Sequence, residues 1–153
     1  MYVFRKRTLV IIAIAWNLLV LNGCGVSDDP ATRTLVDASA RGDDASVSEL
    51  LLAGVNPNLA DGKEGPTPLV IAASRGNKST IRLLLVGGAN INVSAVPGTP
   101  LYAAALNGQR DCIVLLKKHG AKLRINEAQA NGLRRRLLEQ KMDEIKQLLA
   151  PEI

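Results

Sequence analysis

The chain has 153 residues, which is enough for one domain but too few for two of ordinary size. Hydrophobic residues make up 47% of the chain and charged residues 22%, a globular composition that excludes wholesale disorder. Aromatic residues make up only 3%, which excludes a stacking platform for single-stranded nucleic acid or sugars. The formal net charge of +5 includes three basic residues at positions 5–7, in a segment that we expect to be removed.

The N-terminal segment has the pattern of a secretory signal. The basic residues at positions 5–7 precede residues 8–21, which are apolar apart from Thr8 and Asn17. As a helix this stretch extends roughly 21 Å at about 1.5 Å per residue, which is short of the roughly 30 Å hydrocarbon layer of a membrane. We therefore expect residues 1–23 to be a signal peptide.

The end of this segment, Leu21-Asn22-Gly23-Cys24, resembles the lipobox of bacterial lipoproteins. The resemblance implies that the Cys24 sulfur carries diacylglycerol, that the chain is cut before Cys24, and that the new amino group is acylated. Gly25 follows instead of Asp, which implies a periplasmic protein anchored in the outer membrane. Two alternatives remain open: an ordinary secretory signal with an incidental cysteine, and a short anchor that is retained.

The next residues, 24–32, are small, polar and contain a proline, so we expect a flexible tether. A chain of this length lets the folded body stand on the order of 15–20 Å from its anchor.

The rest of the chain repeats. Residues 35–42, 69–76 and 101–108 each begin with leucine and end with glycine, and a second apolar stripe follows each of them. The stripes start at Val47, Ile81, Ile113 and Ile145, which are 34, 32 and 32 positions apart. This period predicts a solenoid of paired helices. Its units are expected at about 33–64, 65–96, 97–128 and 129–150.

The repeats resemble ankyrin repeats. The tripeptide Thr-Pro-Leu occurs at 67–69 and at 99–101, and Gly-Ala-Asn-Ile-Asn at 88–92 matches the family's repeat ending. The resemblance covers about residues 33–150 and implies an all-α solenoid of about four helix-turn-helix repeats with short β-hairpin loops. In the last unit Asn131-Gly132-Leu133 replaces Thr-Pro-Leu, which suits a capping repeat.

Several motif residues have a clear physical role. A threonine hydroxyl can cap a helix N-terminus, and a proline fits the first helical position, where its missing N–H costs nothing. Glycine permits the tight turn between paired helices and the left-handed conformation that ends the second helix. We expect these roles for Thr67, Thr99, Pro68, Pro100, Gly42, Gly54, Gly76, Gly88, Gly108 and Gly120.

Candidate catalytic groups are few. Asp43 and Asp44 could form a catalytic or metal-binding pair, but their place after a turn glycine favours a solvated turn or helix cap. The single histidine, His119, falls near a predicted helix C-terminus, where a structural role is expected. We expect Cys112 to be small, partly buried and inert, with thiol sensing or intermolecular pairing as alternatives. The sequence therefore predicts no enzyme, no metal site and no cofactor.

Basic residues gather in the second half of the chain. Residues 24–64 hold eight acidic and three basic side chains (−5), whereas residues 65–153 hold six acidic and thirteen basic ones (+7). The densest cluster is either a solvated capping face or a contact surface for anionic lipid or an acidic partner, and an exported protein is not expected to bind nucleic acid. The cluster consists of Lys117, Lys118, Lys122, Arg124, Arg134, Arg135 and Arg136. Lys117 takes a position that is normally apolar, so its charged end must reach solvent along an apolar stem.

The resemblance also implies a binding surface. Ankyrin proteins hold another protein on the concave side, between the loop tips and the exposed positions of the first helices. Carried over to this chain, the tip residues are Lys63, Glu64, Val96 and Pro97. The helix residues are Ile71, Ser74, Arg75, Ala103, Leu106 and Asn107.

Taken together, these patterns predict a protein-binding lipoprotein of the bacterial envelope that is a monomer on its own. One hypothesis for its role is an immunity protein that inhibits an envelope-acting toxin, such as a phospholipase effector. The alternative is a periplasmic scaffold or chaperone for a resident enzyme or stress factor.

Overall fold

The computed structural model describes residues 29–62, 65–95, 97–139 and 142–150. The predicted signal peptide, Cys24, Lys63, Glu64 and Val96 lie outside these residues. Within the described ranges the chain forms eight α-helices and no β-strand, which confirms the predicted all-α class. The helices are α2 (Pro30–Arg41), α3 (Asp44–Leu52), α4 (Pro68–Arg75), α5 (Lys78–Val86), α6 (Pro100–Leu106), α7 (Arg110–Lys118), α8 (Glu127–Glu139) and α9 (Asp143–Leu149).

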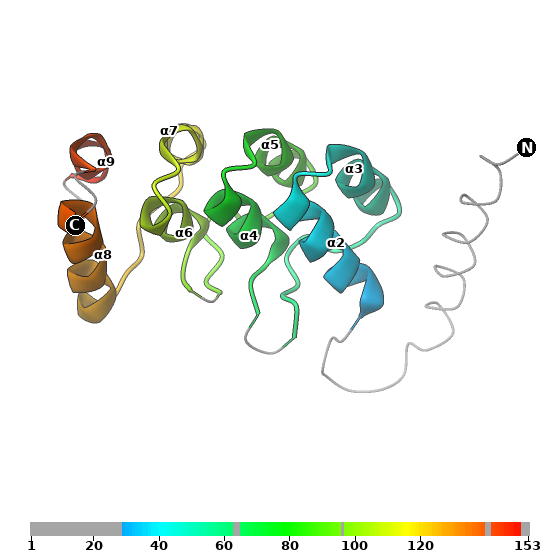
Figure 1. Cartoon of the computed structure of the whole chain (residues 1–153). Helices are drawn as coiled ribbons and strands as arrows, with labels where there is room; N and C mark the ends of the chain where they lie inside the picture. The colour runs from blue at the N-terminus through cyan, green and yellow to red at the C-terminus, as the bar shows by residue number, and fades with distance from the viewer. Residues whose placement is uncertain (1–28, 63–64, 96, 140–141, 151–153) are drawn as a thin grey trace, which may run out of the picture.

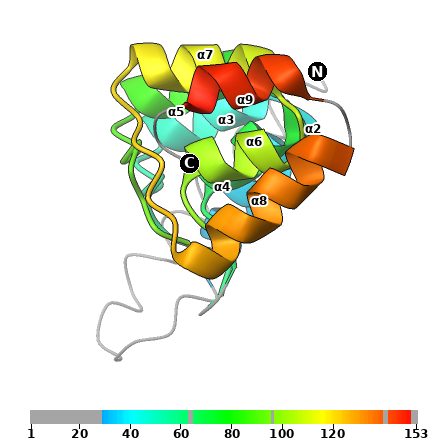
Figure 2. The same cartoon turned by 90° about the vertical axis from the view of Figure 1, so that its left-hand side faces the viewer.

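The helices form four pairs that stack side by side (Figure 1). The first helices of the pairs, α2, α4, α6 and α8, make one row, and the second helices, α3, α5, α7 and α9, make the other. We call these the inner row and the outer row. In both rows each helix packs on the next one along the stack, and Figure 2 shows the two rows as layers when the molecule is viewed along the stack. The predicted solenoid of four helix-turn-helix repeats is thereby confirmed.

The predicted caps begin two of the inner helices. The Thr67 hydroxyl oxygen accepts the Val70 N–H at 3.4 Å, and the Thr99 hydroxyl oxygen accepts the Tyr102 N–H at 3.3 Å. A proline follows each threonine as the first helical residue. The Thr-Pro-Leu motif therefore sets where α4 and α6 begin.

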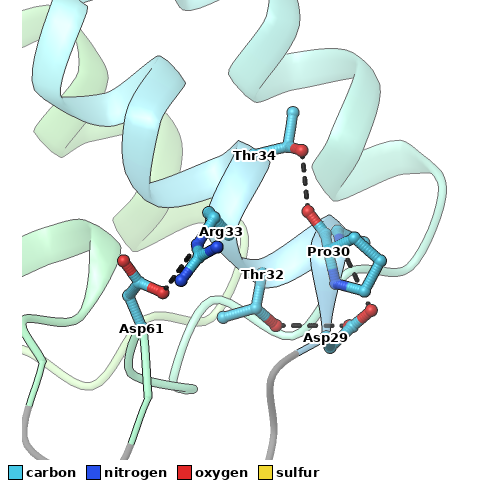
Figure 3. A network of polar contacts seen from close by, with 7 residues as sticks. Asp29, Pro30, Thr32, Arg33, Thr34 and Asp61 are labelled. Atoms are coloured by element: carbon cyan, nitrogen blue, oxygen red, sulfur yellow. Dashed lines mark hydrogen bonds and ion pairs between the residues drawn. The ribbon is translucent and has the colours of Figure 1, made fainter.

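The first helix begins earlier than expected (Figure 3). Since α2 starts at Pro30, the prediction of a flexible tether is wrong for residues 30–32. The Asp29 carboxylate accepts the Ala31 N–H at 3.2 Å and the Thr32 hydroxyl at 3.3 Å, which caps this helix. Arg33 on its exposed side forms an ion pair of 3.3 Å with Asp61. An aspartate before proline thus does here what threonine does in the next two repeats.

The turns inside the first two pairs need glycine for two reasons. Gly42 and Gly76 have φ angles of +72° and +85°, which side-chain-bearing residues rarely adopt. They also leave room for a side chain of the following repeat. Asn77 lies against Gly42 and donates its amide to the carbonyl oxygens of Ser39 at 2.8 Å and Ala40 at 3.1 Å. These bonds join the first repeat to the second.

Asparagines join the connections between repeats in a similar way. Asn58 donates to the Gly88 carbonyl at 3.1 Å and accepts the Asn90 N–H at 2.7 Å. One repeat further on, Asn92 accepts the Lys122 N–H at 2.7 Å. The connections therefore stack in register with the helices, although they contain no strand in the part that the structure describes.

The core is an aliphatic ladder. The equivalent residues Leu35, Leu69, Leu101 and Leu133 are at most 1% exposed, and so are Val47, Ile81 and Ile113 in the outer row. Burying a leucine or isoleucine side chain stabilises the fold by roughly 1.5–3 kcal/mol. Because these residues lie between neighbouring pairs, each repeat depends on the next for its burial.

Candidate functional site

The inner row carries an open hollow of about 520 Å³ near the C-terminal ends of α4 and α6. Ile71, Ser74 and Arg75 line it from α4, and Asn107 and Gln109 line it from the turn after α6. Four of these five residues belong to the binding surface predicted from the sequence. The structure therefore brings residues from two repeats into one concave site.

Three hydrogen bonds hold the polar floor of this hollow, and the two that reach Ser74 cross from one repeat to the other. The Asn107 side-chain amide donates to the Ser74 hydroxyl oxygen at 3.1 Å and to the Ala103 carbonyl at 2.8 Å. Gln109 adds a longer contact of 3.5 Å to the Ser74 carbonyl. The Asn107 bond uses a lone pair of the Ser74 hydroxyl and leaves the hydroxyl hydrogen available for a ligand. The floor thus holds the Ser74 oxygen in place, while its hydroxyl hydrogen can turn toward a ligand.

Arg75 supplies the charge of the site. It is the last residue of α4 and is exposed to solvent. No other described residue forms a hydrogen bond or ion pair with its guanidinium group. An unpaired guanidinium beside a hydroxyl donor is suited to a carboxylate, which accepts two parallel N–H bonds from arginine.

The remaining predicted contact residues differ in their exposure. Leu106 is half-buried and packs against the core, and Pro97 is exposed at its loop tip, where its carbonyl accepts the Gln129 amide at 3.0 Å. Ala103 is 0% exposed, so its prediction as a contact residue is wrong. Its methyl group is too short to rise above the side chains around it, because α6 is packed between α4 and α8.

Gln109 is a site residue that the sequence analysis missed. It follows Gly108 as Asn77 follows Gly76, and both side chains reach back over the turn glycine of the preceding repeat. The sequence signal for this residue is that an amide side chain directly follows the turn glycine in both of these repeats.

The predicted basic cluster does not form one face. Lys117 is half-buried, and its ammonium group donates a hydrogen bond of 2.7 Å to the Leu148 carbonyl near the end of α9. Lys118, Lys122 and Arg124 are exposed around the end of α7 and the segment that follows it. These residues belong to the edge of the third repeat and are separate from the helix that carries the arginines.

The three consecutive arginines of α8 point in different directions, because successive helical residues are about 100° apart. Arg134 lines a hollow of about 230 Å³ at the end of the stack, together with Leu138 and Lys146. Arg136 lies near enough to Tyr102 to oppose the rise in the pKa of this phenol that burial causes. The three arginines of α8 therefore do not all lie on one side of the helix.

The acidic pair has two structural roles. Asp43 caps α3 by accepting the Ser46 hydroxyl at 2.6 Å and the Ser46 N–H at 3.2 Å, and these bonds hold the pKa of Asp43 below its usual value. Asp44 accepts the Thr80 hydroxyl at 2.6 Å from the next repeat. The predicted cap is confirmed for Asp43.

Cys112 and His119 lie apart from the hollow. Cys112 is 1% exposed, more deeply buried than expected, and burial raises the pKa of its thiol. The charge of Asp111 raises this pKa further, whereas Lys78 lowers it. His119 is exposed at the end of α7. Within the described ranges no three His, Cys, Asp or Glu side chains come together to hold a metal ion, and no helix is long and apolar enough to cross a membrane.

Comparison with known families agrees with this geometry. The family model for ankyrin repeats (3 copies) matches residues 35–127, which is more than half of the chain. The match includes all of α3 to α7 and every residue that lines the hollow on the inner row. A search of curated proteins finds no match.

Proposed function

Because the chain belongs to the ankyrin repeat family, whose repeats form protein-interaction modules, we propose that it holds a partner protein over the hollow between α4 and α6. The observation that carries this proposal is the shared site of Ile71, Ser74, Arg75 and Asn107. It combines an apolar wall, a fixed hydroxyl and an unpaired cation, the mixture that small binding clefts use. The protein acts in this proposal by binding and not by catalysis.

Site-specific crosslinking tests the location of the partner. A photo-reactive residue at position 71 faces the hollow, whereas one at Ser79, exposed on α5 of the outer row, is the matched control. We expect a protein adduct from position 71 that is absent from position 79. Equal adducts from both positions, or none from any inner-row position, would show that the inner row is not the binding surface.

We propose further that the module works in the bacterial envelope. The signal-like pattern of residues 1–23 and the lipobox-like sequence before Cys24 support a lipid-anchored periplasmic protein, with the outer membrane as its location. Acyl chains at roughly 0.8 kcal/mol per buried methylene hold such a protein firmly on a membrane. Cys24→Ser is expected to abolish labelling by radioactive palmitate and to move the protein from the membrane to the soluble fraction. Unchanged labelling contradicts the anchor.

An exported and tethered binding module is suited to neutralising a toxin that acts at the envelope. We propose that the partner is such a toxin, for example a phospholipase effector, and that the stack covers its catalytic cleft. A deletion strain is then expected to lose viability when mixed with toxin-delivering competitors. If the deletion instead lowers the activity of a resident enzyme in a culture without competitors, the role is that of a scaffold or chaperone.

Assays of the purified protein test the absence of catalysis. We expect no turnover of phospholipid or peptidoglycan substrates by the wild-type chain. Turnover that Asp43→Asn abolishes would identify an enzyme instead.

A further inference from the structure

The hollow indicates the chemistry of the segment that it binds. We propose that its occupant is an acidic, extended segment of the partner protein, with one carboxylate on Arg75 and a second on Arg41. This inference deepens the proposed function and rests on it.

The two arginines occupy equivalent positions in neighbouring repeats. Arg41 ends α2 and Arg75 ends α4, and each precedes a turn glycine, Gly42 or Gly76. Both are exposed, and neither forms a hydrogen bond or ion pair within the described residues, but the charge of Arg41 lies near enough to Asp43 to help lower the pKa of that carboxyl. Since α2 packs directly on α4, the two helix axes lie about 8–10 Å apart. In an extended segment the side chains two residues apart point to the same side and lie about 6.6 Å apart, a spacing that two long arginine side chains on neighbouring helices can match.

The lining of the hollow is complementary to a carboxylate. None of its five lining residues is acidic. Ser74 offers its hydroxyl hydrogen next to Arg75, because its oxygen already accepts from Asn107. Ile71 provides an apolar contact for the stem of a glutamate or for a neighbouring apolar residue. Asp37 is an exposed acidic position of α2, the equivalent of Ile71 one repeat earlier, and its charge opposes an acidic ligand.

The same residues argue against nucleic acid as the occupant. Sequence-tolerant binding of single strands uses aromatic side chains on which bases stack. Tyr102 is the one aromatic side chain within the described part of the chain, and it is only 6% exposed. The positive charge of the hollow is therefore better matched by a protein carboxylate than by a phosphate chain with bases.

Selection from a random peptide library tests the proposal without knowledge of the natural partner. The full-length protein is immobilised in detergent, 12-residue peptides on phage are selected against it, and recovered peptides are synthesised for fluorescence anisotropy. We expect these peptides to be enriched in Asp and Glu, and binding is expected to weaken about tenfold when the single acidic residue to which it is most sensitive is replaced by the corresponding amide. This factor corresponds to about 1.4 kcal/mol, a reasonable value for one charge-assisted contact.

Three arginine variants locate the contact. Arg75→Gln is expected to weaken binding about tenfold and Arg41→Gln severalfold. Arg82→Gln removes the same charge from an exposed position of the outer row and is expected to change Kd by less than twofold. Asp37→Asn is expected to strengthen binding. Circular dichroism confirms that each variant keeps its helices.

The outcomes separate this inference from the proposed function. Neutral or basic peptides that lose binding on Ile71→Glu overturn the acidic partner but leave the inner row as the binding surface. Equal effects of the Arg75 and Arg82 variants, or a single-stranded oligonucleotide that displaces the peptide and binds more tightly, also overturn the inference. If no peptide is recovered, or if Ile71→Glu leaves binding unchanged, both the inference and the proposed location of the site fail.

Discussion

Asn77→Asp tests whether side chains that cross from one repeat to the next stabilise the stack. The wild-type amide donates two hydrogen bonds, to Ser39 and Ala40, and each contributes about 1 kcal/mol to stability. The introduced carboxylate cannot donate them, and it lies beside two carbonyl oxygens that repel it. We expect a loss of about 3 kcal/mol in the free energy of unfolding, compared with about 2 kcal/mol for Asn77→Ala.

The assay is equilibrium urea unfolding of the full-length protein followed by circular dichroism, with thermal melts as a second measure. For a folded body of this size, 1 kcal/mol corresponds to roughly 4 °C in Tm, so Asn77→Asp is expected to lower Tm by about 12 °C. Asn131→Asp makes the same chemical change at an exposed position of α8 and is the matched control. If both variants lose the same stability, the bonds from Asn77 do not hold the repeats together.

The penalty of Asn77→Asp also depends on pH. Carbonyl oxygens beside the introduced carboxyl raise its folded-state pKa above the unfolded value of about 3.9. Protonation restores one donor, so the penalty is smallest below the unfolded pKa and becomes complete as the pH rises through the folded pKa. The difference in stability between wild type and variant is thus expected to be smaller at pH 4 than at pH 7. A difference that is constant over this range contradicts the assigned contact.

Three further predictions follow from other contacts. Gly76→Ala is expected to destabilise the protein more than Gly54→Ala in urea unfolding, since both have positive φ but only the first has a side chain of the next repeat against it. Cys112 is expected to react with a thiol reagent only as fast as the protein opens, because it is buried and its pKa is raised. Ser46→Ala is expected to raise the pKa of Asp43 in an NMR titration, because the hydroxyl that donates to this carboxylate is removed. The carboxylate of Asp43 then stabilises the fold less. Its contribution is present above the unfolded pKa and is lost as the pH falls through the folded pKa.

The architecture was predictable because the same sequence signals recur in each repeat. Thr-Pro at two helix starts, glycine at the turns and branched residues at a constant offset are local signals with local causes, and the structure confirms their roles. The start of α2 was missed because Asp29 and Pro30 perform the same task with a different cap. Such a helix start can be found from the sequence only when several residue types are considered as the N-cap.

The binding surface was predictable only in part, because exposure depends on what the neighbours place around each position. Ile71 and Ala103 are equivalent in the repeat, yet only the longer side chain reaches the surface. The arginines of α8 are adjacent in sequence, yet helical geometry sends them apart. Both errors came from treating nearness in the sequence, or equivalence in the repeat, as nearness in space.

The positions that make the stack and those that make the site are different positions of the same repeat. Where the repeats agree, as at Leu35, Leu69 and Leu101, the side chains are buried and build the solenoid. Where equivalent residues differ, as in the change from Arg75 to Asn107, the side chains are exposed and face the open side of the inner row. The buried positions are constrained by the stability of the fold, whereas the exposed positions of the inner row are free to vary with the partner. The surface chemistry of the hollow can therefore change without loss of the fold, which is why the charge at Arg75 is informative about what binds there.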